Sequence, residues 1–533
     1  MAIISIYSAK TEQRMHSPVA APFMQVQRGF LSGRYEMMKP HLFLLGLCVL
    51  AGCTVGVAQN GRSLPTIAGV PETPQTIGTS IATFSSLATA TVTPTVTMPL
   101  PSTTQPPFNV LSPWLGPTER VSVTTNGTQA EGSSEGLSIS ADGRFVAFTS
   151  DASNLVDGDE NGMVDVFVYD RQTSITQMVS VTPDGAPGNG ASGIRIEVGS
   201  KTSVSANGRF IAFHSFASNL IIDDTNEAAD IFLYDTELKS VERISISSEG
   251  TAGNGSSLWP DLSADGRIVA FISEANNLVP NDTNNVADIF VHDLATGITY
   301  RVSLASDGTE ANNGSGEQGV PRLSADGRFV TFVSFADNLI PDDTNQKPDV
   351  FVHDRQTGET VRVSVAYDGS QANGDSTHPD ISDDGRYVTF QSEATNLVLG
   401  DSNEVTDIFV YDRQTGLTTR ANLTSYGVQS NKPSGSPAIS ADGRWIVFAS
   451  LSTNLAPNTN NSNVLPNIFA HDQQSGQTTI ISLSFDGSAG NQLSVSPAIS
   501  ADGCTVAFAS LASNLVVNDT NERWDVFARD LCQ

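Results

Sequence analysis

Two carboxylate residues, Asp261 and Asp380, are the candidates for acid–base chemistry in this sequence. They stand at the same position in two copies of a repeated segment, 259–263 and 378–382, which read Trp-Pro-Asp-Leu-Ser and His-Pro-Asp-Ile-Ser. Two carboxyl groups facing one cavity can act as general acid and base on a glycosidic bond. The sequence therefore offers one catalytic pair, and it would suit a glycan hydrolase or lyase.

The residues around this pair differ between copies of the repeat, and they are candidates for ligand binding. Positions where the copies agree serve packing, whereas positions that diverge at the mouth of a channel can recognise a ligand. Another copy carries small residues at the corresponding positions, Ser436 and Ala438. The alternative is a funnel wall that is merely solvated. The predicted ligand-binding set is Lys201, Trp259, Asp261, Arg322, His378 and Asp380.

An acidic loop at 157–165, Asp-Gly-Asp-Glu-Asn-Gly-Met-Val-Asp, is a candidate Ca²⁺ site. Oxygen ligands at alternate positions suit this ion, and Asp157, Asp159, Asn161 and Asp165 would supply them. The alternative is an Asx-type turn that caps the next strand. Other copies keep a shorter pattern, namely Asp224/Asn226/Asp230, Asp282/Asn284/Asp288, Asp343/Asn345/Asp349, Asp401/Asn403/Asp407 and Asp519/Asn521/Asp525. One copy is neutral, with Asn461, Asn463 and Asn467.

Other kinds of chemistry find little support in the sequence. Residues 132–136 match Gly-x-Ser-x-Gly, but no α/β pattern surrounds them. The histidines His292, His353 and His471 share one strand position, which indicates a structural role and not a zinc site. The net charge of −29 argues against nucleic acid and against adsorption to anionic lipid. No cofactor is predicted with certainty beyond the candidate Ca²⁺.

These residues belong to a unit that occurs seven times. Each copy carries Ser-x-(Asp/Asn)-Gly-(Arg/Cys), followed by short apolar strands with turn residues at fixed offsets. Four short antiparallel strands per unit are typical of a propeller blade. One phenylalanine in the second strand and one in the third recur in every copy, and we expect them to pack between blades. The copies begin at Ser140, Ser205, Ser263, Ser324, Ser382, Ser440 and Ser500.

The ends of the repeat predict how the ring closes. The seventh unit stops after its third strand, 525–530, and an orphan fourth strand, 120–123, precedes the first unit. The N-terminal strand should therefore complete the last blade and remove the free edges. We predict an all-β fold, a closed seven-bladed β-propeller. Cys504 and Cys532 fall at opposite ends of one hairpin in the last blade, where a disulfide is geometrically reasonable.

The N-terminal part of the chain predicts a location. Residues 37–53 have a basic start, a short apolar run and Leu-Ala-Gly-Cys, and they resemble a bacterial lipoprotein signal peptide with its lipobox. That resemblance implies lipidation of Cys53 and a place in the bacterial cell envelope, outside the cytoplasm. Residues 1–36 do not fit in front of such a signal and are interpreted as a spurious or disordered extension. The Thr/Ser/Pro-rich residues 54–117 are interpreted as a stalk.

The consensus Pro-x-(Ile/Leu)-Ser-x-Asp-Gly-Arg-x-(Val/Ile)-x-Phe-x-Ser, followed by Asp-(Ile/Val)-Phe-x-x-Asp, resembles the repeat of TolB-like propellers, relatives of the WD-repeat proteins. It covers residues 119–533. TolB itself has six blades and an N-terminal α/β domain, so a role in the Tol machinery does not follow. The resemblance implies a propeller fold, and this fold hosts many functions.

We expect a monomeric binding or scaffolding module, held to the membrane by its lipid anchor alone. The long loops of a propeller share one face, and binding usually uses long loops on a rigid scaffold. Protein or carbohydrate is therefore expected on the long-loop face. The alternatives are the glycan enzyme above and a purely structural envelope protein.

Overall fold

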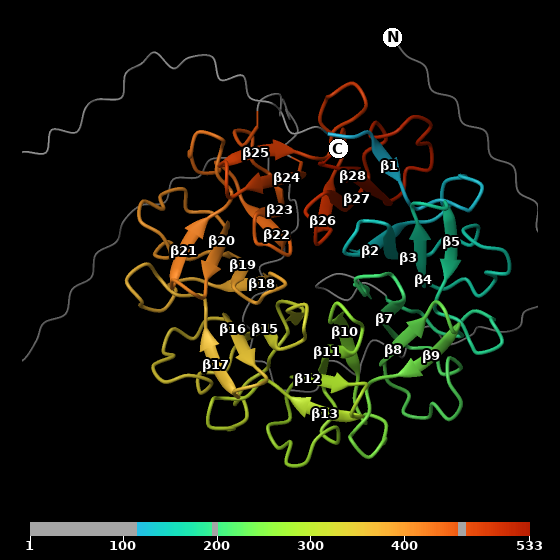
Figure 1. Cartoon of the computed structure of the whole chain (residues 1–533), viewed down its shortest axis with the longest axis horizontal. Coiled ribbons are helices and arrows are strands. Elements are labelled where there is room, and N and C mark those ends of the chain that lie inside the picture. The colour runs from blue at the N-terminus through green and yellow to red at the C-terminus, as the bar shows by residue number, and fades with distance from the viewer. Residues whose placement is uncertain (1–114, 194–200, 457–464, 533) are drawn as a thin grey trace, which may run out of the picture. The chain divides into compact units, whose positions relative to one another are not determined.

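The computed structural model describes residues 115–193, 201–456 and 465–532, which form seven four-stranded antiparallel sheets arranged in a ring (Figure 1). In each sheet the strands follow one another from the centre of the ring to its rim. The predicted seven-bladed β-propeller is confirmed. Within these described ranges there is no helix, and hence none long and apolar enough to cross a membrane. The predicted signal peptide, Cys53 and nearly all of the predicted stalk lie outside the described residues.

The blades are numbered in chain order, and the strands of each are given from the centre outward. Blade one comprises β2 (Ser134–Ile139), β3 (Phe145–Ser150), β4 (Asp165–Asp170) and β5 (Ile175–Met178). Blade two comprises β6 (Ser203–Val204), β7 (Phe210–Ser215), β8 (Asp230–Asp235) and β9 (Ser240–Arg243). Blade three comprises β10 (Ser257–Leu262), β11 (Ile268–Ser273), β12 (Asp288–Asp293) and β13 (Ile298–Arg301). Blade four comprises β14 (Arg322–Leu323), β15 (Phe329–Ser334), β16 (Asp349–Asp354) and β17 (Glu359–Arg362).

The remaining three blades complete the circle. Blade five comprises β18 (Ser376–Ile381), β19 (Tyr387–Ser392), β20 (Asp407–Asp412) and β21 (Leu417–Arg420). Blade six comprises β22 (Ser434–Ile439), β23 (Trp445–Ser450), β24 (Asn467–Asp472) and β25 (Gln477–Ile480). Blade seven comprises β26 (Ser494–Ile499), β27 (Thr505–Ser510), β28 (Asp525–Asp530) and, from the other end of the chain, β1 (Thr118–Arg120).

The repeated serine motif forms the tight turn between the first and second strands of each blade. In blade one the Ser140 hydroxyl donates to Asp142 Oδ1 at 2.7 Å and accepts the Phe145 N–H at 2.9 Å. Gly143 has a φ of +70°, a conformation that a side chain disfavours. The motif is therefore a self-contained turn whose residues serve the backbone.

The ring closes as the sequence predicts. Strand β1 pairs antiparallel with β28, with Glu119 opposite Ala528. A disulfide joins Cys504 to Cys532, with a Cα–Cα distance of 5.0 Å, and it confirms the predicted pairing. Contacts of the propeller begin slightly before β1, because the Gly116 N–H donates to the Asp530 carbonyl at 3.0 Å. Both ends of the folded ring are thus tied to the same blade.

The repeated phenylalanines form the core of every blade. The second-strand and third-strand rings are cross-strand partners, as Phe271 and Phe290 are in blade three. Their centroids lie 6.0 Å apart, and all seven pairs fall between 5.7 and 6.0 Å. All of these rings are fully buried. Phe213 of blade two also packs in a cluster with Val166 of blade one, so the predicted packing between blades is confirmed.

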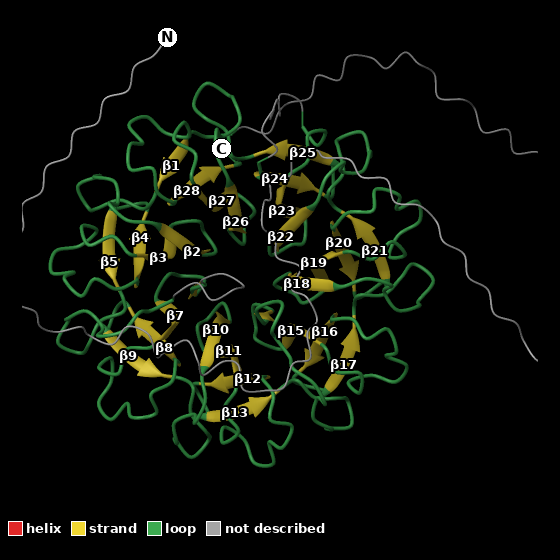
Figure 2. Cartoon of the chain, turned by 180° about the vertical axis from the view of Figure 1, so that it is seen from behind, coloured by secondary structure: helices red, strands yellow, loops and turns green. Residues whose placement is uncertain are grey.

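A circle of backbone hydrogen bonds joins the tight turns around the central axis. The Ala141 N–H donates to the Ala206 carbonyl at 3.1 Å, and the same bond links each turn to the next. The last link runs from the Asp502 N–H to the Ala141 carbonyl at 3.3 Å. Seen from behind, the inner strands surround this axis (Figure 2). One end of the central channel is thus built from backbone and alanine side chains, with Asp383 in place of alanine in blade five.

Candidate functional site: the central cavity

A cavity of about 280 Å³ lies on the axis of the ring, and all seven inner strands contribute to its wall. It is lined at one end by the residues that follow the serine of the turn motif, such as Ala141 and Ala264. At the other end it is lined by inner-strand residues such as His378 and Ser436. The cavity therefore reaches from the long-loop side of the inner strands to the tight turns, beyond the long-loop face named by the sequence.

Three charged side chains from consecutive blades meet in this wall. Arg322 of β14 lies between Asp261 of β10 and Asp380 of β18. Its Nη1 is 3.2 Å from Asp261 Oδ1, and its Nε is 3.3 Å from Asp380 Oδ1. The second oxygen of each aspartate accepts a backbone N–H at 2.9 Å, from Leu323 for Asp261 and from Ile439 for Asp380. The two carboxylates thus hold one shared cation and tie neighbouring blades together.

Lys201 and His378 add two titratable groups to the same wall. Burial, and secondarily the positive charge of Arg322, lower the pKa of Lys201 to about 7, although Asp261 and Asp380 oppose the shift. Burial, with a smaller contribution from Lys201, lowers the pKa of His378 to about 4. At neutral pH the histidine is therefore uncharged, and the lysine is present in both its charged and its neutral form.

Trp259 does not line the cavity, although it occupies the same repeat position as His378. Both residues sit at a β-bulge of the inner strand, each with a φ of +52°. Trp259 is 7% exposed and packs in an apolar cluster with residues of blade four such as Leu323 and Val330. The structure thus brings together five of the six predicted binding residues and places the sixth in the core.

Two cavity residues, Asp383 and Ser203, were missed by sequence reasoning. Asp383 is exposed at the tight-turn end of the cavity, where six other blades have alanine. This departure from the turn motif is the signal that could have identified it. The Ser203 hydroxyl donates to Asp261 Oδ1 at 3.2 Å. No sequence signal distinguishes Ser203, because small residues also occupy this repeat position in other blades.

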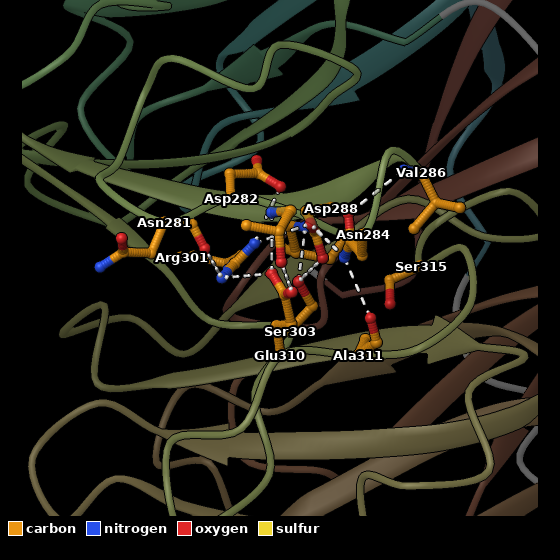
Figure 3. A network of polar contacts seen from close by, with 12 residues as sticks. Asn281, Asp282, Asn284, Val286, Asp288, Arg301, Ser303, Glu310, Ala311 and Ser315 are labelled. Carbon is orange, nitrogen blue, oxygen red and sulfur yellow. Dashed lines mark hydrogen bonds and ion pairs between the residues drawn. The ribbon is translucent and has the colours of Figure 1, made fainter.

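The predicted metal-binding loops adopt one repeated geometry, drawn for blade three in Figure 3. The Asn284 amide donates to Asp288 Oδ2 at 2.8 Å and to the Ala311 carbonyl at 3.0 Å, while Ser303 donates to Asp288 Oδ1 at 2.5 Å. Arg301 contacts both carboxylates of the loop, at 3.1 Å from Asp282 and 3.2 Å from Asp288. In this blade an arginine neutralises the acidic pair that the sequence presents.

The first-blade loop keeps the same frame around Asn161. Its amide donates to Asp165 Oδ2 at 2.6 Å and to the Gly188 carbonyl at 3.0 Å, and its oxygen accepts the Met163 N–H. Burial, followed by the charge of Asp165, raises the pKa of Asp159 to about 6. Asp157 is exposed. In the part of the chain that the structure describes, no three His, Cys, Asp or Glu side chains are gathered as a metal site.

The fold and its polar axis define the class of this protein: a seven-bladed β-propeller with a charged central cavity. No family model and no curated protein match the chain. Solved structures that are similar to it include an oligogalacturonate lyase from Vibrio parahaemolyticus, with 13% identity, a TM-score of 0.45 and coverage of 78% of this chain and 96% of that one. TolB from Acinetobacter baumannii is also similar, with 16% identity, a TM-score of 0.34 and coverage of 75% and 78%.

A third similar structure is the β-propeller domain of the Trilobed protease from Pyrococcus furiosus. It has 11% identity and a TM-score of 0.44, with coverage of 76% of this chain and 97% of that one. TolB proteins are thus among the similar structures. These similarities concern the fold, and they say nothing about a ligand or an activity.

Proposed function

We propose that this protein is a binding module that engages a polar group of a protein or carbohydrate in its central cavity. One observation carries the proposal. Charged and polar side chains converge from four consecutive blades, two to five, whereas blades six and seven present Ser, Pro and Ala to the same cavity. A wall of uniform small residues would suffice for packing, so the polar sector is the part of the ring suited to recognition.

The chemistry of this sector suits a ligand rich in hydroxyl or amide groups. Lys201 and Arg322 are donors, Asp261 and Asp380 are acceptors, and a neutral His378 offers both functions. The formal charges of the four ionisable groups cancel when Lys201 is protonated. A volume of about 280 Å³ would take one sugar residue or one protein side chain. Mixed donors and acceptors in a confined space favour such a group over a large apolar ligand.

The contacts of the two aspartates bear on the enzyme alternative. A general acid must carry a proton, and a general base must aim an available oxygen at the substrate. Asp261 and Asp380 instead share Arg322, and each accepts a backbone N–H. This arrangement favours binding over acid–base chemistry, and we retain glycan cleavage as the alternative. It predicts turnover of a glycan that Asp261→Asn abolishes.

We further propose that the propeller is held outside the cytoplasm by a lipid on Cys53, with residues 54–117 as the stalk. The disulfide between Cys504 and Cys532 supports this location, because such bonds persist in oxidising compartments. Expression of the full chain and of Cys53→Ser in a bacterium, followed by membrane fractionation, tests the anchor. The substitution should release the protein from the membrane fraction, and retention there would contradict the proposal.

Binding of the purified protein to glycan and peptide arrays tests the function. A saturable ligand should be found, and Lys201→Met and His378→Ala should each weaken its binding by at least tenfold. Ser436→Ala, in the small-residue wall of the same cavity, is the matched control and should bind normally. Unchanged affinity in Lys201→Met and His378→Ala would contradict the assignment of the central cavity as the binding site. Absence of any saturable ligand on either array would favour a purely structural protein.

A further inference from the structure

Five of the seven blades place an arginine at one position, with its side chain only 6 to 13% exposed, where it holds the acidic loop between the second and third strands. The arginine is the last residue of the fourth strand in each case, two residues before the serine or asparagine that donates to the third-strand aspartate. Its nitrogens lie 3.0 to 3.6 Å from two carboxylates. The sets are Arg120 with Asp519 and Asp525, Arg243 with Asp224 and Asp230, Arg301 with Asp282 and Asp288, Arg362 with Asp343 and Asp349, and Arg420 with Asp401 and Asp407.

Blade one keeps both carboxylates but has methionine at the arginine position. Met178 pairs with Phe167 in the same register in which Arg301 pairs with Phe290. Met178 is 5% exposed and packs in an apolar cluster, so it brings no charge to the loop. The compensation that five blades supply to this acidic pair is therefore missing here.

Asp159 is consequently buried without a partner. It is 7% exposed, and across the described ranges no residue donates a hydrogen bond to it or forms an ion pair with it. Its counterparts in the five arginine blades each lie within 3.4 Å of a guanidinium nitrogen. Asp165 is fully buried and is held by Ser180 and Asn161, as its counterparts are. A buried carboxylate with no counter-charge is costly, and blade one contains one beside a second carboxylate.

Blade six shows the other way in which the repeat solves this problem. Its fourth strand has Ile480 at the arginine position, and its third strand begins with Asn467 in place of aspartate. The positive and negative groups are thus lost together. This pairing of losses indicates that the acidic pair needs a cation.

Blade one instead adds acidic residues at the rim of its loop. Asp157 stands where the arginine blades have apolar residues, and Glu160 stands where they have threonine or serine; both are exposed. Two rim positions that are uncharged in the arginine blades are thus acidic in the blade that lacks the arginine. The apolar counterparts of Asp157 are Ile222, Pro280, Pro341, Leu399 and Val517.

We propose that blade one binds a hard divalent cation, such as Ca²⁺, between Asp159 and Asp165, where the other blades place a guanidinium group. Carboxylate oxygens are suitable ligands for this ion, and water would complete its coordination. The Asn161 carboxamide already bonds to the loop backbone and to Asp165. It therefore orients the Asp165 carboxylate toward the cation and does not bind the cation itself. Asp157 and Glu160 attract the cation at the entrance. With two buried protein ligands, the dissociation constant should be about 10⁻⁴ to 10⁻³ M, as in extracellular calcium modules.

The test compares thermal unfolding of the full chain with and without the cation. Metal-free protein is titrated with CaCl₂ to 10 mM, with ionic strength held constant by KCl. The midpoint should rise saturably, by about 1 to 3 °C, because an ion that binds the folded state stabilises it. Met178→Arg restores the arginine of the repeat and should remove this response. Asp159→Asn should also remove it.

Titration calorimetry with CaCl₂ and MgCl₂ on the same three proteins provides a second measurement. One binding event of the expected affinity should appear in the wild type and be absent from both variants. A flat Ca²⁺ response in the wild type would overturn the proposal, and so would an undiminished response in Met178→Arg. If Met178→Arg does not fold, Asp159→Asn decides alone. These outcomes do not depend on ligand binding at the central cavity, so failure of the proposed function would leave the Ca²⁺ responses unchanged.

Discussion

Ser122 donates a 2.6 Å hydrogen bond to Asp525 Oδ1 across 403 residues of the chain. The same hydroxyl accepts the Val526 N–H at 3.1 Å. Ser303 makes the corresponding contacts with Asp288 and Ile289 inside blade three. The bond that stabilises an ordinary blade therefore also closes the ring.

Ser122→Ala should lower the free energy of unfolding by about 1 to 3 kcal/mol, because it deprives a buried carboxylate and a buried N–H of their partner. Urea denaturation measures this loss. Ser303→Ala is the matched control and should cost a similar amount. Limited proteolysis should separate the two: β28 should be cut faster in Ser122→Ala, where its outer partner is β1. Equal protease resistance of the two variants would contradict a special role of this contact in closure.

Reduction of the bond between Cys504 and Cys532 should destabilise the seventh blade. The chain-entropy model assigns about 3.5 kcal/mol to a cross-link that closes a loop of this length, and the sequence separation is 28 residues. Cys504→Ser and Cys532→Ser should each lower the free energy of unfolding by that amount, and the double variant should lose no more. Additive losses in the double variant would show that the thiols act separately.

His353 should make the protein sensitive to acid. Burial lowers its pKa to about 4 from an ordinary value of 6.5, so the unfolded chain binds the proton more tightly. This contribution to stability is complete above about pH 6.5 and is lost as the pH falls toward 4; about 2 kcal/mol is lost by pH 5. Blades one, two and five carry Tyr169, Tyr234 and Tyr411 at this position. His353→Tyr should therefore reduce the fall in unfolding midpoint between pH 7 and pH 5.

An unchanged acid response in His353→Tyr would show that other groups dominate over this range. His471 offers an independent check, because burial lowers its pKa to about 4 as well and it makes the same contact, to Thr478, that His353 makes to Thr360.

Removal of Arg301 alone should destabilise the protein more than removal of Arg301 together with the charges of Asp282 and Asp288. Arg301→Ile leaves Asp282 and Asp288 buried without a counter-charge, which should destabilise the protein by about 3 to 5 kcal/mol. The triple variant Arg301→Ile, Asp282→Asn, Asp288→Asn copies the composition of blade six and should be more stable than Arg301→Ile. Urea denaturation compares the two. A triple variant less stable than the single one would contradict the interpretation of blade six.

The blades and their number could be predicted from the sequence because their determinants are local. A turn such as 140–143 is specified by residues that contact one another within it, and recurrence of the pattern identified all seven copies. Ring closure could be predicted for the same reason. The last copy lacks its fourth strand and an orphan strand, 120–123, precedes the first copy, and both are evident from the order of the segments along the chain.

The composition of the central cavity depended on contacts between blades. Arg322 lies between Asp261 and Asp380 because the ring brings blade four between blades three and five, although 61 residues separate Arg322 from Asp261. The repeat assigned Trp259 and His378 to equal positions, yet packing against blade four buries the first and leaves the second in the cavity wall.

The acidic loops show the same division between sequence and structure. The sequence by itself determined the architecture, the closing strand, the disulfide and the acidic residues of each loop, because these follow from short-range pattern and from counting. Only the tertiary structure decided which acidic pairs face an arginine, since that residue comes from the next strand of the sheet. It thereby distinguished the first-blade loop, with its uncompensated Asp159, from five loops that resemble it in sequence.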